Sequence, residues 1–126
     1  MRFMMLMYPR IEEAEWEPKG EAFEAMGRYN DELQKAGVLL SLDGLRPPSE
    51  GASVSFDAEG GATVTDGPFT ETKEVVGGYW LIQARSKEEA LEWASRVPGE
   101  SCRVELRRIF ELEDFPQEIQ DAYAGS

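Results

Sequence analysis

Residues Thr65–Ile82 read TDGPFTETKEVVGGYWLI, and they indicate the fold of this 126-residue chain more clearly than any other stretch. Asp66-Gly67-Pro68 predicts a turn, and the polar residues after it predict a surface connector. The run Val75–Ala84 has the length and composition of a β-strand. Successive strand side chains point to opposite faces, so Tyr79 and Trp80 make both faces of this strand apolar. We therefore expect a strand that is buried on both sides.

The segments before this stretch alternate between strand and helix patterns. Phe3–Tyr8 is uniformly apolar and stops at Pro9, which predicts another strand buried on both faces. Apolar residues at steps of three and four predict a helix over Pro18–Ala36, and Gly37 is placed to end it. Val38–Leu45 then predicts a second strand.

A hairpin and a second helix complete the pattern around the decisive stretch. Ala52–Phe56 and Ala62–Thr65 are short alternating segments on either side of a glycine-containing turn, which predicts a β-hairpin. Further along, Ser86 and Glu89 have the spacing of a capping box at the start of a helix. Pro98-Gly99 is placed to end that helix.

The remaining elements lead to a fold class. Cys102–Phe110 alternates as a last long strand, and Pro116–Tyr123 predicts a short amphipathic helix. The order is β-α-β, a hairpin, then β-α-β, which describes a ferredoxin-like α+β sandwich, βαβ(ββ)βαβ. We expect one domain over residues 1–126 with a short helical tail at about 114–126.

The apolar strands also predict an assembly. Phe3–Tyr8 and Val75–Leu81 are apolar on both faces, whereas a lone two-layer sandwich covers only one face of its sheet. Leaving the other face exposed would be unusual for a monomer. We expect a homodimer whose sheets pack face to face into an α/β barrel.

The composition excludes several classes of function. With 25 acidic and 13 basic residues, the formal net charge is −12, which disfavours direct binding to nucleic acid or to an anionic membrane. There is no histidine and only Cys102, so imidazole bases, imidazole ligands and thiolate zinc sites are excluded. No calcium-loop or glycine-rich nucleotide motif occurs, so we expect neither a metal nor a cofactor. The single cysteine and the short apolar start favour a soluble protein of a reducing cytoplasm.

Asp66 is the first candidate for chemistry. It ends a predicted strand just before the Gly67-Pro68 turn. Its carboxylate either accepts backbone amides in that turn or faces a pocket, as a base or as a hydrogen-bond acceptor for a ligand. Lys73, in the polar connector, is either solvated or forms an ion pair with an acidic ligand or with Asp66.

Other residues are candidates for the same pocket. Tyr8 either offers its hydroxyl to a ligand or packs its ring in the core. Asp43 either caps a strand end or approaches the cleft between the sheet and the helices. Gly77 and Gly78 leave space for a ligand or for a close backbone neighbour. The predicted ligand-binding set is Tyr8, Asp43, Asp66, Lys73, Gly77 and Gly78.

Three of these segments resemble a known family. The apolar first strand ending in Tyr8, the Asp66-Gly67-Pro68-Phe69 turn and the ETKE-x-x-GGYWLI segment resemble the YCII-related proteins, in particular their DGPF subgroup. The resemblance covers essentially the whole chain and implies a dimeric α/β barrel of ferredoxin-like protomers. It also implies that the function is largely uncharacterised.

The resemblance implies two kinds of activity. Some relatives are similar to small-molecule enzymes, including a dehydrochlorinase, which are thought to use a His-Asp pair. A chain without histidine cannot form that pair. Other DGPF relatives occur beside or fused to extracytoplasmic-function sigma factors, which implies an accessory role exerted through a protein partner or a sensed ligand.

Two functional hypotheses therefore remain, beside a third interpretation in which the dimer is merely structural. The first is a small-molecule-binding or accessory module that acts as a homodimer, with a pocket lined by Tyr8, Asp66 and the Gly77-Gly78 strand. The second is a lyase- or isomerase-type enzyme in which Asp66 abstracts a proton as general base. The absence of histidine favours the first.

Overall fold

The main sheet has the strand order of a ferredoxin-like sandwich. The computed structural model describes residues 1–67 and 74–124. In them, β1 (Arg2–Tyr8), β2 (Leu39–Gly44), β5 (Gly78–Gln83) and β6 (Arg103–Arg108) form a four-stranded sheet in the order β2-β5-β1-β6. All neighbouring strands are antiparallel. β5 of the second strand–helix–strand unit thus lies between β1 and β2 of the first, and β1 lies between β5 and β6. This interleaving confirms the predicted fold class.

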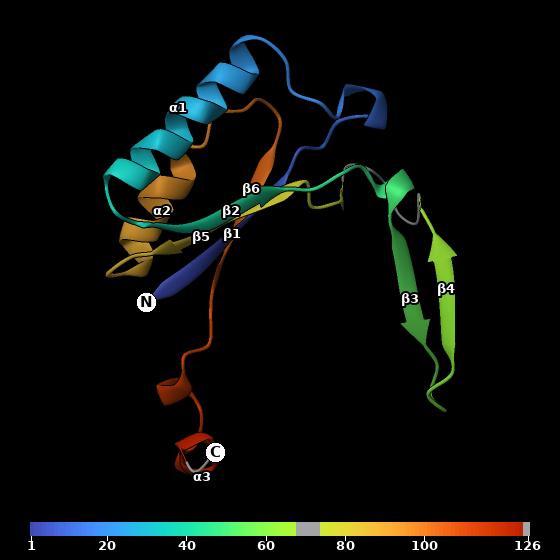
Figure 1. The fold of residues 1–126 in the computed structure, drawn as a ribbon, viewed down its shortest axis with the longest axis vertical. Helices are drawn as coiled ribbons and strands as arrows, with labels where there is room; N and C mark the ends of the chain where they lie inside the picture. Colours follow the sequence, from blue (N-terminus) through green and yellow to red (C-terminus); the bar gives the residue numbers. More distant parts are fainter. Residues whose placement is uncertain (68–73, 125–126) are drawn as a thin grey trace.

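Two helices cover one face of this sheet. Figure 1 shows α1 (Glu21–Lys35) and α2 (Lys87–Ser95) on the same side of the four strands. The pleat of β1 points Phe3 and Met5 at the helices, and both are buried. The core between the two layers consists of Phe3, Met5, Tyr29, Leu33, Trp80, Ile82, Ala84 and Ala90.

Polar tips of core aromatic residues connect the two helices with each other and with the sheet. Tyr29 of α1 donates its hydroxyl hydrogen to the carbonyl of Trp93 in α2, at 2.6 Å. Burial raises the pKa of Tyr29 to about 12. Trp80 of β5 donates its indole N–H to the side-chain oxygen of Asn30 at 2.8 Å, and its ring meets Tyr29 edge-on. The apolar rings are therefore buried without leaving these donors unpaired.

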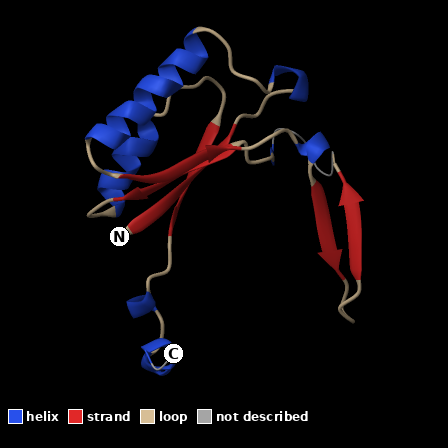
Figure 2. Ribbon diagram, viewed as in Figure 1, coloured by secondary structure: helices blue, strands red, loops and turns tan. Residues whose placement is uncertain are grey.

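The predicted hairpin forms a separate two-stranded sheet. β3 (Ala52–Phe56) and β4 (Ala62–Asp66) pair in antiparallel fashion, and we call residues 52–66 the hairpin arm. At its turn, the Asp57 carboxylate accepts the backbone N–H groups of Glu59 and Gly61. At its base, a Cβ on Gly67 would lie 1.7 Å from the Pro48 carbonyl oxygen, so only glycine fits there. Figure 2 shows the arm standing away from the main sheet.

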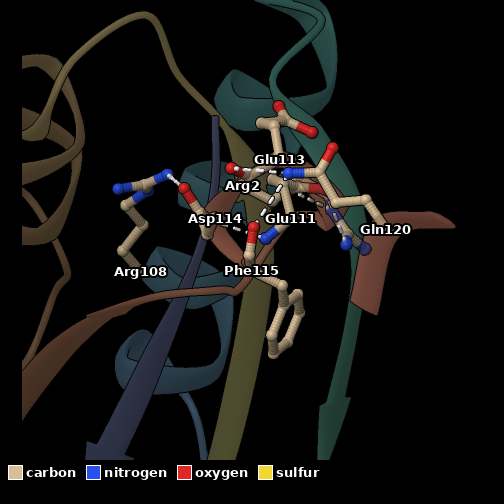
Figure 3. A network of polar contacts seen from close by, with 7 residues as sticks. All are labelled: Arg2, Arg108, Glu111, Glu113, Asp114, Phe115 and Gln120. Atoms are coloured by element: carbon tan, nitrogen blue, oxygen red, sulfur yellow. Dashed lines mark hydrogen bonds and ion pairs between the residues drawn. The ribbon is translucent and has the colours of Figure 1, made fainter. Parts of the chain in front are cut away.

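A network of charged residues holds the C-terminal segment. Beyond β6 lie a short 3₁₀ helix (Leu112–Asp114) and α3 (Gln117–Ala124). Arg2 of β1 makes a bidentate ion pair with Glu111, with nitrogen–oxygen distances of 2.7 and 3.2 Å, and Arg108 pairs with Asp114 (Figure 3). The hydrogen bond from Arg2 lowers the pKa of Glu111 below its usual value. The first strand and the tail are thus tied together.

Several boundaries differ from the sequence prediction. The helix predicted over Pro18–Ala36 begins only at Glu21, because Gly20 has a positive φ of 58° that a helix cannot contain. The strand predicted from Val75 begins at Gly78, and Val75 and Val76 belong to the connection before it.

The capping box is only partly formed. Ser86 accepts the backbone N–H of Glu89 at 3.1 Å, as predicted. The Glu89 carboxylate, however, accepts the backbone N–H of Arg85, together with its guanidinium, instead of reaching the amide of Ser86. The charged side chain of Arg85 therefore draws the carboxylate one residue beyond the cap.

Replacing Leu33 by alanine tests the core. Leu33 is fully enclosed, so Leu33→Ala should leave a cavity and lower the free energy of unfolding by about 2–5 kcal/mol. Phe23→Ala in the same helix is the control, because Phe23 is 66% exposed and its loss should cost about 0.5 kcal/mol or less. Urea unfolding followed by circular dichroism measures both. Equal losses in the two variants would contradict this description of the core.

Candidate functional site

The face of the main sheet opposite the helices carries a mixture of apolar and charged side chains. Residues paired directly across neighbouring strands point to the same face, so the register defines this surface. Neither α1 nor α2 covers it in Figure 1, and we call it the open face. Its members are Met4, Leu6, Tyr8, Ser41, Asp43, Tyr79, Leu81, Arg103, Glu105 and Arg107.

A tyrosine–aspartate pair lies at one end of the open face. Tyr79 of β5 is directly opposite Asp43 of β2, and its hydroxyl donates to Asp43 Oδ2 at 2.8 Å. This hydrogen bond raises the pKa of Tyr79, because the phenol must give up its proton beside a carboxylate; a hydrogen bond from Ser41 acts in the opposite direction. Asp43 is exposed and Tyr79 is half-buried. One acceptor oxygen of Asp43 is engaged, and the other is available to a ligand.

A tyrosine–arginine pair lies beside it. Tyr8 ends β1, and Arg103 begins β6 directly opposite. The Arg103 guanidinium carbon is 4.1 Å from the centre of the Tyr8 ring, which is a cation–π contact. Its Nη1 also lies 3.3 Å from a carboxylate oxygen of Glu105. Because Arg103 is 45% exposed at its side chain, further donors of its guanidinium face solvent.

These two pairs belong to one end of the sheet. Leu6 of β1 lies directly opposite Tyr79 of β5 on one side and Glu105 of β6 on the other, so it lies between these two residues. Tyr8 follows Leu6 on the same face of β1. Hydrogen-bonding groups, aromatic rings and a cation are thus arranged around an apolar patch. Such an arrangement can orient a small molecule that has an anionic group and a ring.

Gly77 and Gly78 lie at the border of this region, where neighbouring segments approach closely. A Cβ on Gly77 would come within 2.8 Å of the Pro9 ring, and a Cβ on Gly78 would come within 3.0 Å of the Asp43 carbonyl oxygen. The Gly77 N–H also donates to the carbonyl of Met7 at 2.7 Å. The missing side chains at both positions therefore allow backbone segments of the same chain to pack together.

Asp66 is not part of this group. Asp66 is the last residue of β4, opposite Ala52, and it is exposed on the hairpin arm rather than on the main sheet. Lys73 lies outside the described residues. The structure therefore brings Tyr8 and Asp43 to one end of the sheet and adds Tyr79 and Arg103 to them.

The described residues contain neither a metal-binding cluster nor a membrane-spanning helix. Within residues 1–67 and 74–124, no three or more cysteine, aspartate or glutamate side chains gather in a way that could hold a metal ion. In the same residues, no helix combines the length and the apolar character needed to cross a membrane.

Comparison with known proteins identifies the family. The sequence model of the YCII-related domain matches residues 1–113. The chain belongs to the YCII-related family. The match includes the main sheet, the hairpin arm and the open face of this YCII-related protein, and it stops before α3. The family assignment thus agrees with the ferredoxin-like fold.

A curated relative supports the same assignment. The chain is 42% identical over 60 residues to Uncharacterized protein R00369 of Rhizobium meliloti (strain 1021). The aligned region covers 48% of this YCII-related chain and 48% of the relative, so the chain spans about half the length of the protein that it matches. The relative's printed name assigns no activity that could be carried over.

The Tyr79–Asp43 hydrogen bond can be tested by titration. Asp43→Asn should lower the pKa of Tyr79, because the neutral amide no longer opposes phenolate formation. A raised pKa means that this bond contributes its full stability below the unfolded-state pKa of about 10 and loses it as the pH rises through the folded-state value. The near-ultraviolet absorbance of ionised tyrosine reports the change, and Tyr79→Phe identifies its signal. An unchanged titration in Asp43→Asn would contradict the pairing.

Proposed function

We propose that this YCII-related protein is a small-molecule-binding module that acts as a homodimer of single-domain chains. The observation that carries the proposal is the adjacency of the Tyr79–Asp43 and Tyr8–Arg103 pairs on a sheet face that the helices leave uncovered. The first pair offers a hydrogen-bond acceptor, and the second offers a cation beside an aromatic ring. A small carboxylic acid with a planar apolar part fits these groups best.

The homodimer is supported by the apolar centre of the open face. Met4, Leu6 and Leu81 are only half-buried within one chain, although they lie on the two central strands. A second copy related by a two-fold axis would cover them with the same surface. Packing of the two sheets through this face is the α/β barrel that the sequence predicts.

The charges on the two edges of the sheet favour one direction of the two-fold axis. β2 presents Asp43 at one edge of the open face, and β6 presents Arg103 and Arg107, with Glu105 between them, at the other. An axis parallel to the strands places the β6 edge of each copy over the β2 edge of the other, so opposite charges meet. An axis across the strands would place arginines over arginines. Electrostatic complementarity therefore favours the parallel axis.

The further residues predicted for ligand binding belong to this proposal in different ways. Gly77 and Gly78 would shape the border of the site through the backbone that packs against them. Asp66 is the last residue of the hairpin arm and Lys73 follows the arm in sequence, and we propose them as outer contacts of a ligand. No observation favours the lyase or isomerase alternative. Asp66 is exposed on the hairpin arm, and neither of the two polar pairs includes it.

The link to sigma factors is the accessory form of the same proposal. In that form, the bound molecule would be the signal and a protein partner would receive it. The net charge of −12 supports a protein partner over DNA, since phosphate groups would be repelled. The Asp66-Gly67-Pro68-Phe69 sequence, typical of the DGPF subgroup, is what motivates this form.

A ligand screen with paired variants tests the binding site. Small carboxylates with a planar ring, with benzoate as the simplest probe, should raise the melting temperature of the wild-type protein. Arg103→Gln should abolish the rise by removing the cation beside Tyr8, whereas Arg107→Gln, on the same face of the same strand, should retain it. Absence of any rise across the panel, or the same loss in both variants, would overturn the proposed site.

Sedimentation equilibrium of the wild-type protein tests the homodimer. We expect a species of twice the chain mass of 14.2 kDa at micromolar concentration. The reason is that pairing two copies removes Met4, Leu6 and Leu81 from water. A single 14.2 kDa species at every concentration up to the micromolar range would refute it.

A further inference from the structure

The hairpin arm has one apolar face that the described part of the chain leaves exposed. The register places Val54 opposite Val64 and Phe56 opposite Ala62, so these side chains share a face. Val54, Phe56 and Val64 are 50%, 71% and 64% exposed. The other face carries only small hydroxyl side chains, from Ser53, Ser55, Thr63 and Thr65. A lone two-stranded hairpin is marginally stable in water, so its apolar face needs a cover.

The arm leaves the main sheet at the corner nearest the candidate site. The chain enters it after β2, an edge strand, and returns to β5, the neighbour of β2. Asp43 and Tyr79 lie at this same end of the two strands. Figure 1 shows the arm extending away on the side opposite α1 and α2. The arm is thus placed to reach a molecule that covers the open face.

A second copy of this chain brings a matching surface to that corner. A two-fold axis parallel to the strands places the β6 edge of one copy over the β2 edge of the other. The strand ends that carry Asp43 and Tyr79 then lie at the same end of both copies. The strand below the base of the arm is then β6 of the second copy, at the end where that strand begins with Arg103. The arm extends toward the β6 edge of the second copy and away from α1 and α2 of its own chain.

The charges of the two surfaces are opposite. The arm, residues 52–66, includes no lysine or arginine, and its acids are Asp57, Glu59 and Asp66. β6 has the reverse balance on the open face, where Arg103 and Arg107 flank the single acid Glu105 and both pair with it; Arg108 lies on the other face and pairs with Asp114. An acidic arm beside an arginine-rich strand is electrostatically favourable, and the same arm would be repelled by nucleic acid.

We propose that the hairpin arm of each copy binds the second copy along its β6 edge, with the Val54, Phe56 and Val64 face buried in the contact. This inference rests on the proposed homodimer and goes beyond it, because it gives the arm an interface role. The arm of one copy then lies beside Tyr8 and Arg103 of the other. Each candidate site is consequently completed by the partner's arm, and only the dimer contains a closed site.

Photo-crosslinking tests the contact directly. Benzoylphenylalanine placed at Phe56, on the apolar face, should give a covalent dimer on irradiation of the purified protein. The same group at Ser55, on the opposite face of β3, is the matched control and should give far less. Fragment analysis should place the crosslink on β6 of the second copy. A crosslink confined to one chain, or equal yields at the two positions, would overturn the proposal.

The strength of the dimer gives an independent test. Val54→Ser with Phe56→Ser should raise the dimer dissociation constant roughly tenfold or more, because two apolar side chains per arm lose their cover. Ser53→Ala with Ser55→Ala is the control on the opposite face of the same strand and should leave the constant unchanged.

A shortened arm guards against misfolding of the serine variant. Replacing residues 53–65 by Asn-Gly joins Ala52 to Asp66, which already pair in the register, and should weaken the dimer to the same extent. A wild-type protein that never dimerises would overturn the proposed homodimer together with this inference. A wild-type dimer that the serine variant and the shortened arm leave unchanged would overturn only the role of the arm.

Discussion

The structure depends on the unequal cover of the two faces of the central strands. β1 and β5 carry apolar side chains on both faces, whereas α1 and α2 cover one face only. The pleat then divides β1 into Phe3 and Met5, which are enclosed, and Met4 and Leu6, which remain half-exposed. The open face, the candidate site and the proposed assembly all follow from this unequal cover. If positions 4 and 6 carried polar side chains, water could solvate the open face, and pairing with another copy would bury little apolar surface.

The sequence predicted the fold because its indications are local. The cap at Ser86 and the apolar runs of β1 and β5 depend on neighbours within a few residues. The candidate site was predicted only in part, because pairing across strands is not local. Asp43 meets Tyr79 in a register that shifts between Leu39 and Ser41, and no pattern in the sequence reports such an irregularity. The sequence therefore indicates Tyr79 only as an apolar strand residue.

The most distinctive stretch of the sequence turns out to describe close backbone packing. Gly67 has the Pro48 carbonyl where a side chain would be, and Gly77 and Gly78 have Pro9 and Asp43 against them. Steric contact requires glycine at positions 67 and 77, and Gly78 packs closely on the Asp43 carbonyl. The polar groups of the candidate site instead come from segments without a conspicuous motif. The motif therefore indicates where the backbone packs around the candidate site, but not which side chains supply its polar groups.

The ion pair between Arg2 and Glu111 has a consequence for the ends of the chain. Chain termini are usually where fraying begins, yet here the first strand and the segment after the last strand are held by one bidentate contact. The contact therefore couples the segment after β6 to the first strand. Since both side chains are partly exposed, mobile ions screen their attraction. Higher ionic strength thus loosens the segment after β6, whereas β1 stays held by its two neighbouring strands and by Phe3 and Met5 in the core.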